Sequence, residues 1–369
     1  MKRICCIFNF APHYRQAIYR LMDKELACDF YFGNQAETRI RPMDVTTLHG
    51  YKGNVKNLRL FSHFYWQRHI LSLLRQPYDT YLLTGEFYNL SLWAFLFFTR
   101  LCHKNKKVYL WTHGWYGREN AWKKFLKKLL FRHTDGLFLY GEHARKLMIE
   151  NGFNPDKLHC IANSLDYDKQ KTIRKTLAHT DIYNRTFGNQ LPTCIYVGRL
   201  QPSKRLDLLI QATSILQHPN RTSCNLLIVG DGDNKSELED LVHTYKLEKS
   251  VRFYGSCYDE KKLAELFYNA TACVSPGNVG LTALHAMSFG CPVITHDTFE
   301  LQMPEYETIT ENKTGLFFHK DSAEDLARAI EEWLHKAPVA DETRTACFET
   351  IDKKWNPYYQ INVLKQILK

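Results

Sequence analysis

Short apolar runs alternate with amphipathic helical patterns along the whole chain. The runs cover residues 3–8, 79–83, 107–112, 136–140 and 158–161 in the first half, and residues 194–197, 225–229, 251–254, 272–274 and 293–295 in the second. Such runs, separated by helices, are typical of strands in parallel sheets that are covered on both faces. Because the chain has 369 residues and a domain usually has about 100–200, the pattern predicts an α/β protein with two Rossmann-like domains.

A polar and strongly charged stretch with weak periodicity separates the two sets of strands. A helical pattern closes the chain. We therefore expect an N-terminal domain over residues 1–168, an interdomain linker over 169–190, a C-terminal domain over 191–352 and a final helix over 353–369.

Charge is distributed unevenly between the two halves. Residues 1–180 hold 29 Lys and Arg against 14 Asp and Glu, whereas residues 181–369 hold 20 against 25. Such asymmetry usually indicates a polyanionic or membrane partner for the basic half. The sequence has no zinc-finger or RNA-binding signature, and the half that carries the motifs described below is acidic, so we expect no nucleic-acid partner.

Cysteine usage and hydropathy indicate where the chain resides. The 11 cysteines include no Cys-x-x-Cys pair, which argues against a disulfide framework and a thiolate zinc site. The most apolar stretch, residues 90–101, is too short for a bilayer span of about 20 residues, and the N-terminus lacks the features of a signal peptide. We therefore expect a cytoplasmic protein with reduced thiols.

Two cations follow the first strand of the second half. The chain runs through Gly198 into a loop that carries Arg199 and Lys204 and then into a helix. Ligands of open α/β sheets bind at the carboxyl ends of strands, where Arg can bind a diphosphate through two hydrogen bonds and Lys acts as a point charge. The loop is a candidate phosphate site; a solvated loop with ordinary surface cations is the alternative.

A second candidate ligand loop lies between the strand near residue 274 and a helix that begins near Leu281. Gly277 and Gly280 would let a ligand approach the backbone closely. Unpaired N–H groups at the start of the helix can bind an anion or sugar hydroxyls. His285 lies one turn further along, where it is either a structural hydrogen-bonding residue or a ligand contact.

Three motifs occur in a characteristic order and spacing. They are Gly-Arg-Leu-x-x-Ser-Lys-Arg at 198–205, Val-Gly-Asp-Gly at 229–232, and Ser-Pro-x-x-x-Gly-Leu-x-x-Leu-x-Ala-Met-x-x-Gly-x-Pro-Val-Ile at 275–294. Over residues 190–360 the chain resembles the group 1 (GT4-type) retaining glycosyltransferases of the GT-B fold, of the bacterial surface-polysaccharide type. The resemblance implies two Rossmann-like domains whose parallel sheets face each other across a cleft, with a final helix that crosses back to the N-terminal domain.

The resemblance also implies a nucleotide-diphosphate sugar donor bound by the C-terminal domain, with no metal and no other cofactor. Arg199 and Lys204 match the catalytic pair that neutralises the donor diphosphate. Further donor contacts are implied at Gly198, Gly255, Gly277, Asn278, Val279, Gly280, Leu281 and His285. The family usually carries Glu at the positions of Gly277 and His285, and this departure leaves the identity of the donor sugar open.

In the first half the resemblance concerns the ends of strands. His113 matches the family's histidine beside the reacting centre, and a turn histidine is the alternative. Glu142 matches a strand-end Ser-Glu position, while His13 and Arg15 lie in the first loop, where many relatives carry a Gly-Gly pair. These last three residues are candidates for the acceptor side of the site.

Residues 121–132 form the clearest amphipathic pattern of the chain. Trp122 and four further apolar residues lie on one face, and the other face carries Lys123, Lys124, Lys127 and Lys128. The pattern fits a surface helix that covers a sheet, or a helix that contacts anionic lipid heads through Trp122 and the lysines. A lipid-linked acceptor at the inner face of the cell membrane would account for the basic half of the chain.

The sequence as a whole predicts a retaining glycosyltransferase that moves a sugar from a nucleotide-diphosphate donor to a glycan acceptor. We expect a lipid-linked acceptor, a peripheral position at the membrane and a role in synthesis of capsule, O-antigen (lipopolysaccharide) or exopolysaccharide. Because the usual Glu pair is missing, a catalytically weak GT-B protein that binds nucleotide sugar or glycan as an assembly partner is the alternative.

Overall fold

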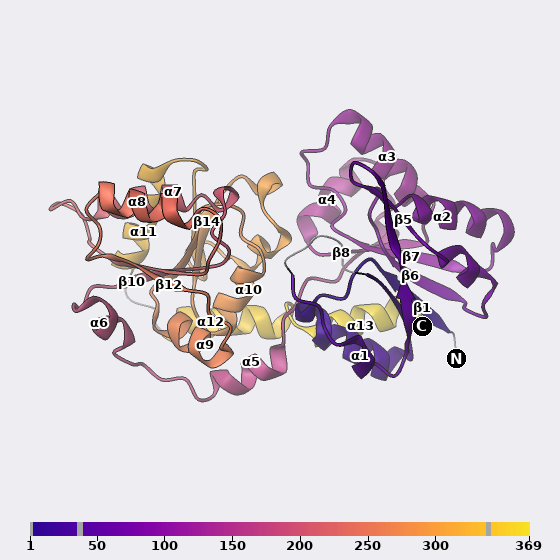
Figure 1. The fold of residues 1–369 in the computed structure, drawn as a ribbon, viewed down its shortest axis with the longest axis horizontal. Helices are drawn as coiled ribbons and strands as arrows, with labels where there is room; N and C mark the ends of the chain where they lie inside the picture. The colour runs from indigo at the N-terminus through magenta and orange to yellow at the C-terminus, as the bar shows by residue number, and fades with distance from the viewer. Residues whose placement is uncertain (1–2, 35–39, 337–340) are drawn as a thin grey trace. The chain divides into compact units, whose positions relative to one another are not determined.

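A computed structural model describes residues 3–34, 40–336 and 341–369 (Figure 1). The chain divides into two compact units. Unit 1 comprises Met1–Asp166 and Asn356–Lys369, and unit 2 comprises Tyr167–Trp355. Each unit contains its own parallel sheet, as the alternation of apolar runs and helices predicts.

Unit 1 is built on a seven-stranded sheet in which every pair of neighbours is parallel. Its strands, in spatial order, are β3 (Tyr51–Val55), β2 (Asp29–Gly33), β1 (Ile4–Phe8), β6 (Thr80–Thr84), β7 (Lys107–Thr112), β8 (Gly136–Leu139) and β9 (Leu158–Cys160). Successive residues of β1 enter two different cores: Cys5 and Ile7 pack in one, and Ile4 and Cys6 in the other. The sheet is therefore buried on both faces, which is why its central strands read as continuous apolar runs.

Five helices and a hairpin accompany this sheet. They are α1 (Gln16–Leu26), α2 (Leu90–Cys102), α3 (Ala121–Arg132), α4 (Glu142–Glu150), α13 (Pro357–Leu368) and the antiparallel pair β4 (Asn57–Phe61) and β5 (Phe64–Gln67). Helix α13 packs against α1, and Ile361 and Leu364 lie in the same core as Ile18 of α1. Buried Gln360 holds the helix to the end of β9, donating to Ala162 O at 3.0 Å and accepting from Ser164 Oγ at 2.6 Å.

Unit 2 is built on a six-stranded parallel sheet. Its strands, in spatial order, are β12 (Val251–Gly255), β11 (Asn225–Val229), β10 (Thr193–Val197), β13 (Ala272–Ser275), β14 (Val293–His296) and β15 (Gly315–Phe318). Its larger helices are α7 (Leu206–Leu216), α8 (Lys235–Thr244), α9 (Glu260–Asn269), α10 (Leu281–Ser288), α11 (Ala323–His335) and α12 (Asp341–Lys353).

Both sheets have a point at which the strand order reverses. In unit 1 the chain leaves β1 towards β2 on one side and later returns to β6 on the other, and in unit 2 β10 is flanked in the same way by β11 and β13. Loops at such a switch point diverge at the carboxyl ends of the strands and leave a crevice for ligands. The polar residues considered below follow β1, β6 and β7 in unit 1, and β10 and β13 in unit 2.

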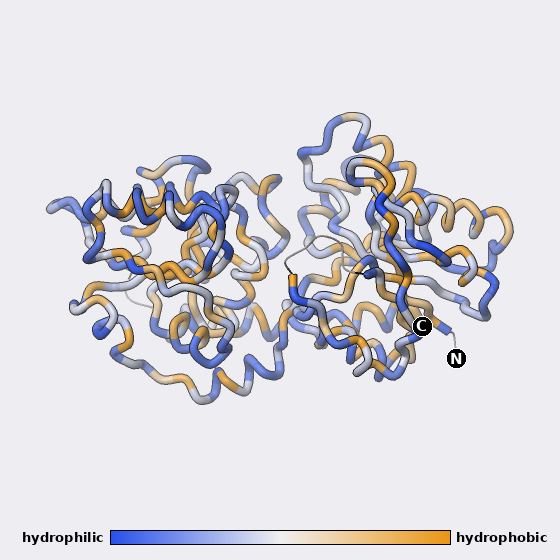
Figure 2. The backbone as a smooth tube through the Cα atoms, viewed as in Figure 1, coloured by the Kyte–Doolittle hydropathy of each residue, from blue (hydrophilic) through white to orange (hydrophobic). Residues whose placement is uncertain are grey.

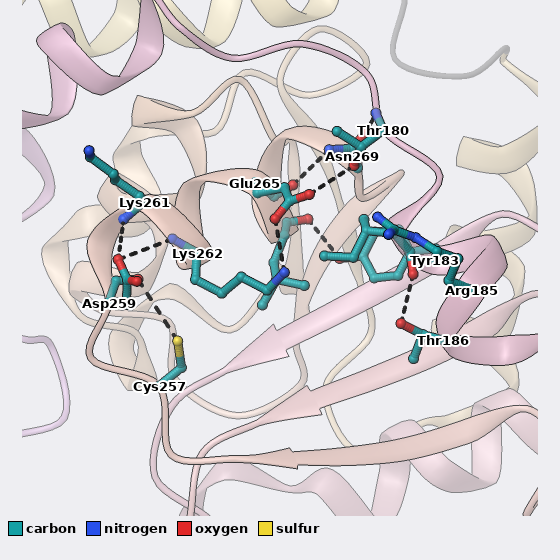
Figure 3. A network of polar contacts seen from close by, with 12 residues as sticks. Thr180, Tyr183, Arg185, Thr186, Cys257, Asp259, Lys261, Lys262, Glu265 and Asn269 are labelled. Atoms are coloured by element: carbon teal, nitrogen blue, oxygen red, sulfur yellow. Dashed lines mark hydrogen bonds and ion pairs between the residues drawn. The ribbon is translucent and has the colours of Figure 1, made fainter.

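The segment expected as an interdomain linker, residues 169–190, is part of unit 2. It forms α5 (Tyr167–Arg174) and α6 (Ile182–Phe187), and the chain between them is held against α9 (Figure 3). Thr180 donates through its backbone N to Asn269 Oδ1 at 2.8 Å and through Oγ1 to Glu265 at 3.0 Å, and buried Tyr183 donates to Leu266 O at 2.6 Å. A few buried side chains anchor this segment although its composition is polar, so the expected linker was wrong.

Helix α3 presents its side chains differently from the expected pattern. Trp122 and Phe125 are 49% and 65% exposed, so these aromatic residues do not cover the sheet. Lys127, expected among the outward lysines, instead faces inward, donating to Gly114 O at 2.9 Å and forming an ion pair with Glu119 at 2.7 Å. The Glu119 carboxylate is itself almost fully buried and needs a cationic partner, which explains the orientation of Lys127.

Helix α2 is hydrophobic nearly throughout (Figure 2). Its Phe97, Phe98 and Leu101 side chains are exposed. Within residues 3–34, 40–336 and 341–369, no helix combines the length and hydropathy needed to cross a bilayer.

Candidate functional site

The loop after β10 places two cations at the switch point of unit 2. Arg199 is exposed, and its carbonyl oxygen is held by the Tyr196 hydroxyl at 3.0 Å. Lys204 ends a short 3-10 turn, Pro202–Lys204, and its ammonium donates to the carbonyl and side-chain oxygens of Asn278 at 2.9 and 2.8 Å. The ammonium therefore has a fixed position and a third N–H that a ligand can use.

The electrostatics of this loop favour an anion. Burial lowers the pKa of Lys204, the charge of Arg199 lowers it further, and the carboxylate of Glu305 raises it. The Lys204 ammonium is therefore mainly desolvated, and it also lies within reach of the positive charge of Arg199. The next cation, Arg205, is turned away into ion pairs with Asp207 and Asp321, which leaves Arg199 and Lys204 as the pair at the strand end.

Two close backbone approaches and one left-handed backbone conformation explain the glycines around these cations. A Cβ on Gly230 would lie 1.8 Å from Gly198 O, and one on Gly277 would lie 2.4 Å from Ser203 O. Gly255 ends β12 with a φ of 83°, and its carbonyl accepts from Gly230 N at 2.8 Å. Packing therefore requires Gly230 and Gly277, and the left-handed φ favours glycine at position 255, whether or not a ligand is bound.

The loop between β13 and α10 is fastened on both sides. Gly277 N donates to Lys204 O at 3.0 Å, and Val279 N donates to Gln302 Oε1 at 2.7 Å. The N–H of Val279, expected as a donor contact, is thus already used within the protein. Helix α10 begins at Leu281, and its N-cap residue, Gly280, has no side chain that could accept a hydrogen bond from the first N–H groups of the helix. These N–H groups are therefore the remaining backbone candidates for a ligand.

His285 on α10 is paired with a carboxylate that the sequence did not reveal. Its Nε2 lies 3.0 Å from Glu260 Oε1, and Gln170 Nε2 donates to the same oxygen at 3.0 Å. Burial raises the pKa of Glu260, but the hydrogen bond and charge of His285, the hydrogen bond from Gln170 and the charge of Lys169 together lower it to about 2. A carboxylate therefore stands beside the position where the family usually carries Glu, supplied by α9 instead of α10.

Unit 1 contains a cavity of about 650 Å³ at its own switch point. Its walls come from the loops after β1, β6 and β7, from the end of β8, and from the β4–β5 hairpin. The cavity is within the volume range of small-molecule sites, about 300–1,000 Å³. The polar and aromatic residues that line it include Asn9, Arg15, Tyr65, Glu86, Trp111 and His113.

Of the three expected acceptor-side residues, Arg15 lines this cavity, whereas His13 and Glu142 are not among the described residues that line it. The Arg15 guanidinium lies 5.2 Å from the centre of the Trp111 ring. His13 is exposed, and its Nδ1 lies 3.1 Å from Arg41 O. Glu142 is an exposed residue that begins α4.

His113 is held neutral inside the cavity wall. Burial lowers its pKa to about 3, and the charges of Arg15 and Lys127 act in the same direction. Its ring lies 4.6 Å from the Tyr140 ring, and its Nδ1 is buried without a hydrogen-bond partner among the described residues. At neutral pH this imidazole can form a hydrogen bond with a ligand but cannot act as an acid of ordinary strength.

Glu86 is the functional candidate of unit 1 that the sequence did not single out. It lies two residues after the end of β6. Gly85, between them, has no room for a side chain, because a Cβ would lie 2.7 Å from Thr112 Cβ. The signal was present, since a Thr-Gly-Glu sequence ends one of the predicted strands. Asn9, by the same logic, follows β1.

Comparisons with known proteins agree with this architecture. Residues 183–353 match the family model described as "Glycosyl transferases group 1". An uncharacterised glycosyltransferase of Methanocaldococcus jannaschii is 22% identical over 73% of this chain and 69% of its own length. The D-inositol 3-phosphate glycosyltransferase of Corynebacterium aurimucosum is 28% identical over 53% of this chain, and the chain spans about half, 48%, of that relative.

Solved structures match the whole chain. The lipopolysaccharide outer core galactosyltransferase WaaB aligns over 99% of both chains with a TM-score of 0.71 and 15% identity, and Anabaena HepE, solved in complex with UDP, aligns over 100% of both with the same score and identity. The fold of the chain is therefore that of the GT-B glycosyltransferases. Residues 183–353 carry the match to the group 1 glycosyltransferases, which supports a transferase enzyme.

We predict that Gly277→Ala destabilises unit 2. The new Cβ would meet the backbone of Ser203 and Lys204, and overpacking of this kind costs about 1–3 kcal/mol. A thermal denaturation experiment should show a lower Tm. Gly152→Asn is the matched control, because Gly152 has a left-handed φ with no neighbouring atom within 4 Å of the Cβ position and Asn tolerates that conformation; equal Tm values for the two variants would contradict the packing role.

We also predict that His113 makes the protein sensitive to acid. Its pKa is about 3 in the folded chain, whereas an unfolded histidine titrates near 6.5. The stability from neutral His113 is complete above that unfolded value and is lost as the pH falls from there towards 3. His113→Gln should therefore lose less Tm between pH 7 and pH 5 than the wild type; His218→Gln, at an exposed position after α7, should lose as much as the wild type.

Proposed function

We propose that this enzyme transfers a sugar from a nucleotide-diphosphate donor to a glycan acceptor with retention of configuration. The observation that carries the proposal is the pair of cations after β10, in which Asn278 fixes the Lys204 ammonium beside Arg199. A diphosphate leaving group gains negative charge as the sugar departs. Fixed cations stabilise that charge without reorganising, so the proposal needs no metal ion.

Unit 2 supplies the remaining donor contacts in this proposal. The first N–H groups of α10 bind phosphate or sugar oxygens, as helix N-termini do. The His285–Glu260 pair binds the ribose hydroxyls, and the open backbone at Gly255 frames the base. HepE was solved with UDP, with UDP and glucose, and with UDP-glucose, which supports a uridine nucleotide as the first donor to test.

Unit 1 supplies the acceptor site in this proposal. The bond between the donor sugar and its phosphate breaks as the acceptor hydroxyl attacks the same face of the sugar, and an oxygen of the leaving phosphate accepts the acceptor's proton. Neutral His113 contributes a hydrogen bond to a sugar oxygen during this step. Arg15 adds positive charge to the cavity.

We further propose that the enzyme works at the cytoplasmic face of the cell membrane on a lipid-linked glycan. Trp122, Phe125 and Leu129 of α3 are exposed next to Lys124 and Lys128, a combination that suits anionic lipid. The C-terminus of α3 adjoins α2, since Arg100 Nε donates to His133 O at 2.9 Å. The exposed phenylalanines of α2 therefore extend the apolar surface. The similarity to WaaB supports a role in lipopolysaccharide or another surface polysaccharide.

A catalytically weak protein that binds nucleotide sugar or glycan remains the second candidate. One observation favours it: the position where the family usually carries its first Glu is Gly277, and the backbone of Ser203 and Lys204 leaves no space there for a side chain. Transfer or donor hydrolysis in a screen of nucleotide sugars would exclude this candidate.

We predict that Arg199→Ala and Lys204→Ala each lower kcat/KM by about 10²–10³, because each removes a charge that stabilises the leaving diphosphate. The measurement is release of the nucleotide diphosphate from a panel of UDP- and GDP-sugars. Arg328→Ala, which removes a surface cation of α11 in unit 2, should behave as the wild type. Wild-type-like turnover by the Arg199→Ala/Lys204→Ala double variant would overturn the assignment.

We predict that the protein co-sediments with vesicles containing phosphatidylglycerol and less with pure phosphatidylcholine vesicles. Phe125→Ser and Lys124→Glu/Lys128→Glu should each reduce the bound fraction several-fold, since each nearby cation contributes about 1 kcal/mol. Added salt should weaken binding. The control Lys261→Glu changes an exposed lysine of unit 2 and should leave binding unaltered; equal losses in all variants would argue against a surface on α3.

A further inference from the structure

The cavity of unit 1 contains a carboxylate that the protein only partly satisfies. Glu86 lines this cavity and is mostly buried. Asn9 Nδ2 donates to its Oε1 at 2.8 Å, and the Tyr65 hydroxyl donates to its Oε2 at 2.8 Å. Each carboxylate oxygen can accept two hydrogen bonds, so each retains the capacity for one more. Among the described residues, no lysine or arginine forms an ion pair with Glu86.

The position of this carboxylate is fixed by its surroundings. Gly85 N donates to Trp111 O at 2.9 Å and Thr112 Oγ1 donates to Gly85 O at 2.8 Å, so the backbone before Glu86 continues the pairing of β6 with β7. The side chain is held from two sides, by Asn9 after β1 and by Tyr65 on β5. Two oxygens with fixed directions can distinguish one arrangement of ligand donors from another.

The hairpin that carries Tyr65 is itself fastened by buried polar side chains. Asn57 of β4 donates to Asn9 O at 2.9 Å and accepts from Gln67 at 3.0 Å. Gln67 in turn accepts from Asn89, the N-cap of α2, at 2.9 Å. These hydrogen bonds connect the β4–β5 hairpin, which forms part of the cavity wall, to the end of β1 and the start of α2. Tyr65 is therefore held rigidly beside Glu86.

Among the described residues, three charged side chains line the cavity, Glu86, Arg15 and Arg59, and Glu86 is the carboxylate among them. Burial raises the pKa of Glu86, while the hydrogen bond from Tyr65, the charge of Arg15 and the hydrogen bond from Asn9 lower it. Arg15 binds the Tyr140 hydroxyl and lies over the Trp111 ring, and its Nε is buried without a hydrogen-bond partner among the described residues. The charge of Arg15 favours the ionised form of Glu86. The carboxylate of Glu86 would repel an acidic group of a sugar placed against it, whereas it accepts hydrogen bonds from neutral hydroxyl groups.

We infer that Glu86 determines acceptor specificity by accepting hydrogen bonds from two adjacent hydroxyl groups of a neutral sugar ring. This inference rests on the proposed function and names the substrate class of its acceptor site. The ligand class is a pyranose with free neighbouring hydroxyls, and the aromatic side chains of the cavity wall provide its apolar surface. Glu86 and Tyr65 act together, the first as the binding group and the second as its positioning residue.

The test measures binding of methyl pyranosides to the full chain by saturation-transfer NMR and titration. The panel comprises methyl glucoside, galactoside and mannoside, their monodeoxy analogues and methyl glucuronide. We expect the wild type to bind at least one neutral pyranoside. Glu86→Gln should weaken that binding by roughly tenfold or more, because hydrogen bonds to a charged acceptor are lost. Tyr65→Phe should weaken the same binding less. We also expect Glu86→Gln to improve binding of the glucuronide relative to the neutral sugars.

Separate controls distinguish this inference from the proposed function. Glu150→Gln, at an exposed position ending α4, should bind every probe as the wild type does, and UDP binding should be unchanged by Glu86→Gln. In assays of transfer and of donor hydrolysis without acceptor, Glu86→Gln should raise KM for the acceptor only. The inference is overturned if no pyranoside binds, if Glu86→Gln binds the panel as the wild type does, or if Glu86→Gln affects only donor hydrolysis. Failure of the wild type to bind UDP would instead contradict the proposed function.

Discussion

Parallel sheets that are buried on both faces constrain everything else in this enzyme. Residues alternate between two apolar cores along β1, and the same holds for β6, β7 and β8, so the polar side chains of the sheets lie mostly at the strand ends. Polar chemistry gathers where the strands end and where their order reverses. That is why Arg199 follows β10, Glu86 follows β6 and His113 follows β7. The strand order thus determines where the candidate sites lie, and the individual residues determine what each site can bind.

Parts of the fold and site could be predicted because they are local. Each apolar run became a strand, and the order of the motifs indicated the fold and the family match of residues 183–353. The roles of Arg199 and Lys204 stay predictions. The linker was mispredicted because three hydrogen bonds to α9, one of them from buried Tyr183, hold the segment before β10 although its composition is polar. Lys127 was mispredicted because its direction depends on Glu119, which a helical pattern does not encode.

The side chains that contact the candidate site residues from other elements could not be predicted from local sequence patterns. Glu260 meets His285 from a different helix, and Tyr65 meets Glu86 from a hairpin that the apolar runs did not reveal. In both cases the contact joins residues more than twenty positions apart, and it forms only when the sheet has brought their elements together. A strand end followed by a polar residue, as at Glu86, is the one signal that could have been used more fully.

Gln302 has a consequence for binding that goes beyond its role in the loop. This single buried amide accepts from Val279 N and donates to Thr295 Oγ1 and His296 O at 2.9 and 3.0 Å, and Thr295 in turn holds Ser275 O at 2.8 Å. The loop before α10 is thus already ordered by β14. A ligand that binds there does not have to supply the free energy of freezing a mobile loop, which otherwise reduces affinity. In the proposed donor site, modest contacts therefore suffice for binding, including beside Gly277, where the family usually carries Glu.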